Sequence, residues 1–69
     1  MDIYKKVNEM LEKIQQNDAK TVKNDIKNTK NSDLIFMYAV LVKDKDLDQA
    51  STLKVSCLVM DEILTRMSN

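Results

Sequence analysis

The sequence predicts a small all-α protein, a helical bundle completed by oligomerisation. Apolar residues recur at helical spacing, and the chain has neither Gly nor Pro, although tight hairpins and phosphate-binding loops depend on Gly. Its 69 residues include one Cys and no His, so neither an intrachain disulfide nor a His-containing zinc site can staple it. A chain this short buries only about 60% of its unfolded surface. We therefore expect one helical domain, 1–69, whose core is enlarged by association of copies.

The first segment predicts an amphipathic helix over residues 2–16. Asp2 suits the N-cap position, because its carboxylate can accept from a free backbone N–H of the first turn. The apolar residues share a single helical stripe: Ile3, Val7, Met10, Leu11 and Ile14.

Residues 18–30 predict a weaker, basic helix. Helical spacing continues, but Thr21, Asn24 and Asn28 are poor helix formers. At about 100° per residue, the apolar stripe is rotated roughly 90–100° from that of residues 3–14. A break near Asn17-Asp18, with either residue as the new cap, accounts for this rotation.

Nine apolar residues follow without interruption from Leu34 to Val42. Such a run suits either a buried strand or a helix buried on every side, and periodicity alone does not decide between them. We favour a helix over 33–44, because Ser32 suits an N-cap and no Gly turn lies on either side.

The last segment predicts a helix over 47–67, with Asp46 or Asp48 as its cap. It joins the helix at 33–44 through a short polar connector, so the two helices predict an antiparallel αα-hairpin. Its apolar residues recur at three, four, three, four and three, the spacing of a heptad pattern: Ala50, Leu53, Cys57, Met60, Leu64 and Met67.

Self-association is expected because a helix that is apolar all round must be buried all round. The other helices of so small a chain are too few and too polar to cover it, although a compact monomeric bundle is the alternative. Cys57 is expected to be a buried small apolar side chain. The predicted oligomer core consists of Leu34, Ile35, Phe36, Met37, Tyr38, Val40, Leu41, Leu53, Cys57, Met60 and Leu64.

Formal net charge is zero, so no strong overall field directs the protein to nucleic acid or membrane. Four lysines nevertheless recur at helical spacing and, with Tyr4, form the candidate contact for a partner or an anion: Lys20, Lys23, Lys27 and Lys30. The alternative is an ordinary solvated helix face. Specific DNA reading is disfavoured, because Arg66 is the sole arginine.

The sequence lacks suitable residues for catalysis and for metal binding. With no His, a nucleophile would have to rely on Lys or a carboxylate for its base. The run from Asp44 to Asp48 imitates the first ligands of an EF-hand loop, but Gln49 stands where Gly is needed and Val55 where Glu is needed. We therefore expect no enzyme activity, no metal and no cofactor.

Part of the sequence matches a known pattern of helical hairpins in Ser32, Asp33, Leu34, Ile35, Tyr38 and Ala39, then Glu62, Ile63 and Arg66. In these residues, about half of the chain resembles the small helical-hairpin inhibitors of sporulation histidine kinases, the Sda type. The uninterrupted apolar run and the added N-terminal helix depart from that pattern. The resemblance implies a mode of action, inhibition through binding of another protein, rather than membership.

The expected function is that of a small non-catalytic regulatory or inhibitory protein, which binds a partner protein through a helical oligomer. Abundant Asn and Lys are typical of AT-rich genomes, so we expect it to be encoded by a phage or another mobile element. No apolar run approaches the ~20 residues of a membrane span. Charged residues interrupt the first apolar positions, whereas a signal peptide has a continuous apolar stretch there. We therefore expect it in the cytoplasm.

Two other functions stay open. The first is a homo-oligomer that holds a small anionic ligand, such as a nucleotide, between protomers, with the lysines and Tyr4 or Tyr38 lining the site. The second is a weak, non-specific nucleic-acid binder.

Overall fold

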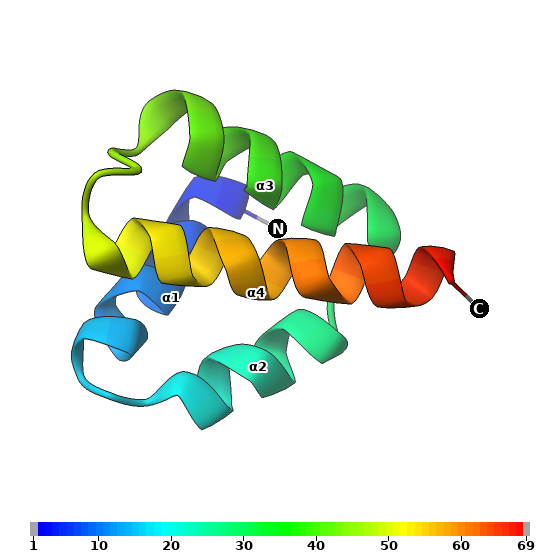
Figure 1. Ribbon diagram of the computed structural model, residues 1–69, viewed down its shortest axis with the longest axis horizontal. Helices are drawn as coiled ribbons and strands as arrows, with labels where there is room; N and C mark the ends of the chain where they lie inside the picture. Colours follow the sequence, from blue (N-terminus) through cyan, green and yellow to red (C-terminus); the bar gives the residue numbers. More distant parts are fainter. Residues whose placement is uncertain (1, 69) are drawn as a thin grey trace.

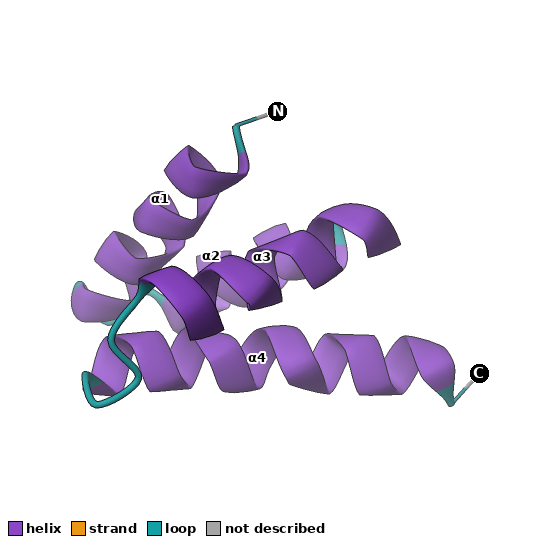
Figure 2. Ribbon diagram, turned by 90° about the horizontal axis from the view of Figure 1, so that it is seen from above, coloured by secondary structure: helices purple, strands orange, loops and turns teal. Residues whose placement is uncertain are grey.

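The computed structural model describes residues 2–68, which form helices and no strand (Figures 1 and 2). The helices are α1 (Ile3–Gln15), α2 (Ala19–Lys27), α3 (Asn31–Asp44) and α4 (Ala50–Met67). The prediction of an all-α fold is therefore confirmed. The apolar run from Leu34 to Val42 is helical and lies within α3.

Helix α4 is the longest and contacts the other three helices. In Figure 1, α3 and α2 lie on opposite sides of α4, and α1 crosses behind it. Helices α3 and α4 run antiparallel, as the predicted hairpin requires. The radius of gyration is 10.9 Å, close to the value of about 11 Å expected for a compact chain of this length. A single copy is thus already compact.

The predicted break between the first two helices lies at Asn17 and Asp18. Asn17 adopts a φ of 61°, a left-handed conformation that Gly usually supplies and that Asn tolerates best among other residues. The N–H of Asp18 donates to the carbonyl of Lys13 at 2.9 Å and that of Asn17 to Ile14 at 3.1 Å, which is the Schellman pattern of a helix C-terminus. The carboxylate of Asp18 then accepts from the Thr21 N–H and caps α2.

The other expected caps divide into one that is confirmed and two that are wrong. Asp2 caps α1 by accepting from the Lys5 N–H at 3.2 Å. Helix α3 begins earlier than expected, with Ser32 inside it and Lys30 at the N-cap. Helix α4 begins later, after Gln49, because the Asp46 carboxylate accepts from the Asp48 N–H at 2.9 Å and forms a local turn instead.

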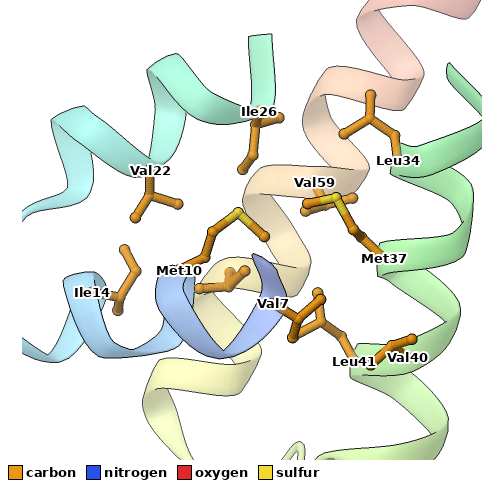
Figure 3. Close-up of a cluster of buried hydrophobic side chains, with 11 residues drawn as sticks. Val7, Met10, Ile14, Val22, Ile26, Leu34, Met37, Val40, Leu41 and Val59 are labelled. Atoms are coloured by element: carbon orange, nitrogen blue, oxygen red, sulfur yellow. The ribbon is translucent and has the colours of Figure 1, made fainter. Parts of the chain in front are cut away.

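A single hydrophobic core lies among the four helices (Figure 3). Every helix contributes to it, including α2, whose Val22 and Ile26 point inward from an otherwise polar segment. The fully or almost fully buried apolar residues are Val7, Met10, Ile14, Val22, Ile26, Leu34, Met37, Val40, Leu41, Val55 and Val59.

Helix α4 turns a different side to this core from the one that its heptad spacing suggests. Thr52, Val55, Ser56 and Val59 face the core, and the Ser56 hydroxyl is satisfied by donating to the Thr52 carbonyl at 2.8 Å. Small side chains on this side let the neighbouring helices approach closely. The expectation that Cys57 is buried is therefore wrong: it is exposed, about 160° around the helix from both Val55 and Val59.

Candidate functional site

Large apolar side chains remain uncovered on one side of the α3–α4 hairpin. Met67 is 76% exposed and Ile35 62%, and Leu53 and Leu64 are each about half exposed. Isolated exposed apolar residues are common on proteins, but a contiguous group marks an interaction surface. We call this surface the hairpin face; it comprises Ile35, Tyr38, Val42, Leu47, Leu53, Cys57, Met60, Leu64 and Met67.

Two hollows between α3 and α4 lie within the hairpin face, one beside each half of α4. One, near the C-terminus of α4, has a volume of about 180 Å³ and is lined by Ile35, Ile63 and Met67 among others. The other, of about 220 Å³, includes Tyr38 and Leu53 in its lining. Pockets for small molecules usually measure about 300–1,000 Å³. These hollows are better matched to protruding side chains of a protein than to a nucleotide.

The residues that the sequence assigned to an oligomer core are divided between two places. Leu34, Met37, Val40 and Leu41 lie in the chain's own core, because α1 and α4 cover that side of α3. They are therefore not available to a second copy. Five of the others line the hollows of the hairpin face: Ile35, Tyr38, Leu53, Cys57 and Met60. Leu64 is half exposed on α4 and belongs to the same face without lining a hollow, whereas Phe36 is half exposed on α3 and lies outside it.

Arg66 joins three helices, a role that the sequence analysis missed. Its Nε donates to Glu62 Oε2 at 2.8 Å within α4, and its Nη1 donates to Asn31 Oδ1 at 2.7 Å on α3. Its Nη2 donates to the carbonyls of Ile26 and Lys27 at 3.3 and 3.1 Å. Those carbonyls end α2, where a cation is favourable. The i,i+4 spacing of Glu62 and Arg66 is the only sequence signal for it.

A second polar link fastens α1 to α2. The Asp25 carboxylate lies 3.3 Å from Lys13 Nζ and 3.9 Å from Lys6 Nζ. The loop before α4 is fastened as well, because Lys45 Nζ donates to Asn8 Oδ1 at 2.6 Å. These contacts stabilise the fold and leave the hairpin face free.

The predicted lysine contact lies elsewhere on the molecule. Lys20, Lys23 and Lys27 are exposed on α2, and Lys30 is exposed just before α3. Lys23 and Lys27 line a shallow hollow together with Asp61 and Glu62 of α4, and these carboxylates reduce the positive potential there. Tyr4 is half exposed on α1. Tyr38, the other tyrosine predicted for an anion site, lines a hollow whose lining also includes the acidic residue Asp61.

Among residues 2–68, no three His, Cys, Asp or Glu side chains converge on a possible metal position. In the same part of the chain, every helix is too short or too polar to cross a membrane. The chain matches no protein-family model, no curated protein and no solved structure. The likeness to kinase inhibitors thus remains an analogy, and the surfaces described above are what the molecule offers to a partner.

Proposed function

We propose that this protein is a small non-catalytic regulatory or inhibitory protein that binds a partner protein as a helical oligomer. The α3–α4 hairpin joins the copies, and the partner is met by the surfaces that remain exposed, above all the lysines of α2. In this proposal, a phage or another mobile element encodes the protein. The protein acts in the cytoplasm of the host cell.

The uncovered hairpin face carries this proposal. The chain is compact without a second copy and has a buried core of its own. The hairpin face therefore does not result from an incomplete fold. An apolar side chain left in water forgoes about 1.5–3 kcal/mol relative to full burial, so a contiguous row of them favours association.

The lysines of α2 supply the second surface because they are exposed and lie on a helix that contributes no residue to the hairpin face. Lys20, Lys23 and Lys27 make no ion pair within residues 2–68. They are free to contact carboxylates of a partner, which directs encounter and specificity more than affinity.

The first test is the mass of the protein in solution. We expect the wild type to be an oligomer in light scattering at micromolar concentrations and above, and Leu64→Lys to be a monomer with unchanged helix content. Thr65→Lys is the matched control, because Thr65 is also exposed on α4 but lies outside the hairpin face. A wild type that remains monomeric up to near-millimolar concentration refutes the oligomer.

The second test is partner capture from the cells that encode the protein. The wild type is expected to retain a specific protein, and a chain with Lys20, Lys23 and Lys27 changed to Glu is expected to lose it while keeping its oligomeric mass. Equal retention by this variant would show that the lysines do not make the contact. Binding of a nucleotide, measured by calorimetry, would instead favour the small-ligand alternative.

A further inference from the structure

We propose that the hairpin face is occupied by a second copy of this chain, in a two-fold symmetric dimer in which the two α4 helices pack antiparallel. This inference rests on the proposed function, because it specifies the geometry of the association proposed there. It depends on two features of α4, the spacing of its exposed apolar residues and the charges beside them.

The exposed apolar residues of α4, together with half-buried Met60 between them, have a spacing that reads the same in both directions. We call them the α4 seam; they are Ala50, Leu53, Cys57, Met60, Leu64 and Met67. Their spacings of three, four, three, four and three are symmetric about the middle. In an antiparallel pair centred there, every seam residue faces another seam residue: Ala50 faces Met67, Leu53 faces Leu64, and Cys57 faces Met60. No apolar side chain of the seam is left opposite a polar one.

The flank of the seam carries one positive and one negative charge, Lys54 and Asp61, which follow Leu53 and Met60 in the sequence. Both are exposed, and neither has an ion-pair partner within residues 2–68. A two-fold axis at right angles to the helices brings the same flank of both copies together. Lys54 of each copy then lies beside Asp61 of the other, offset by about 3 Å along the helix at 1.5 Å per residue.

A parallel pair does not gain these contacts. With the two-fold axis along the helices, opposite flanks meet, and Lys54 and Asp61 would face Gln49, Ser56 and Ile63, which carry no charge. The interface charges therefore select the antiparallel orientation.

The antiparallel register also covers the most exposed apolar side chain of the face. Met67 of the second copy is brought to Ala50, at the end of α4 where Leu47 and Leu53 line the larger hollow. Because the same patch is used by both copies, the contact closes on itself and the assembly is a dimer rather than a fibre.

Charge exchange at the flank tests this register. Lys54→Glu or Asp61→Lys alone places like charges together twice, and we expect the dimer dissociation constant to rise about tenfold to a hundredfold. The double variant restores both pairs and is expected to dimerise like the wild type. An equimolar mixture of the two single variants should form heterodimers, seen by native mass spectrometry. Lys5→Glu is the control, because it makes the same charge change as Lys54→Glu at an exposed position of α1. It should leave dimerisation unchanged.

The outcomes separate this inference from the proposed function. A dimer whose dissociation constant is unaffected by both single variants, or a mixture that remains homodimeric, overturns the antiparallel register while self-association stands. A monomeric wild type overturns both.

Disulfide formation gives an independent reading of the register. Met60→Cys places a thiol opposite Cys57 of the second copy, so mild oxidation is expected to yield a covalent dimer with two disulfides. In a parallel dimer, the Cys57 residues of the two copies would face each other, so the wild type would already form the covalent dimer. If the wild type cross-links as fast as Met60→Cys, the proposal is overturned. Circular dichroism of each variant checks that the fold is retained.

Discussion

Replacement of Arg66 by alanine tests how much one side chain contributes to holding three helices together. The guanidinium donates four hydrogen bonds, two of them to the last carbonyls of α2 and one to Asn31 at the start of α3. A fourth goes to Glu62 in the same helix, and the Arg66 side chain is 25% exposed.

The expected loss follows from these partners. An i,i+4 ion pair on a helix contributes about 0.3–0.5 kcal/mol, a cation at a helix C-terminus about 0.3–1 kcal/mol, and each hydrogen bond about 0.5–1.5 kcal/mol net. Because these values overlap and the side chain is partly solvated, we expect Arg66→Ala to lower the free energy of unfolding by about 2 kcal/mol. In a domain of this size, that corresponds to a fall in Tm of about 8–16 °C.

Urea unfolding followed by circular dichroism at a fixed protein concentration measures the change. Arg66→Lys keeps the charge but loses the planar fork of donors, so it should lose more than half as much stability as Arg66→Ala. Lys20→Ala, which removes an exposed cation from the first turn of α2, should stay within about 0.5 kcal/mol of the wild type. If Arg66→Ala behaves like Lys20→Ala, the side chain does not join the helices in the way described.

Further changes test the turn, the core, the interhelical ion pairs and the thiol. Asn17→Val should lower the free energy of unfolding by about 1–2 kcal/mol, because a β-branched residue resists a positive φ, and Asn17→Gly should not lower it; urea unfolding compares them. Met10→Ala should lower the free energy of unfolding by about 2–5 kcal/mol, because it leaves a cavity in the core; an unfolding temperature equal to that of the wild type would contradict the packing. Asp25→Asn should lose up to about 1 kcal/mol, with the difference from wild type shrinking in molar salt, as screening requires. The Cys57 thiol should react with a maleimide in the folded protein and react more slowly as concentration rises; a thiol that reacts only after unfolding would show that it is buried.

Local signals allowed much of the fold to be predicted. The stripe of α1 and the cap at Asp2 depend on residues within a few positions of each other, and so does the break at Asn17-Asp18. The caps of α3 and α4 were predicted wrongly for two different reasons, one local and one distant in the sequence. Asp46 forms its own turn with Asp48, whereas the start of α3 includes Asn31, which Arg66 holds from the far end of the chain.

The hairpin face could be predicted only in part. The excess of apolar residues in 34–42 and 50–67 indicated that some would remain uncovered. Which ones could not be read from either helix alone, because Leu34 and Leu41 on one side of α3 are covered by other helices while Ile35 and Val42 are not. The lysines of α2 were located correctly as exposed, but their proximity to Asp61 and Glu62 depends on how α2 packs against α4.

By itself, the sequence determined the helix at the N-terminal end and the break at Asn17-Asp18, because apolar spacing and capping are properties of neighbouring residues. It also determined the charge and apolar pattern of the α4 seam. Only the tertiary structure decided which of the two apolar sides of α4 faces the core. The side that faces the core carries Thr52, Val55, Ser56 and Val59, whose small side chains allow the other helices to pack closely. The α4 seam was thereby left on the surface, since one helix cannot turn both sides toward the same core.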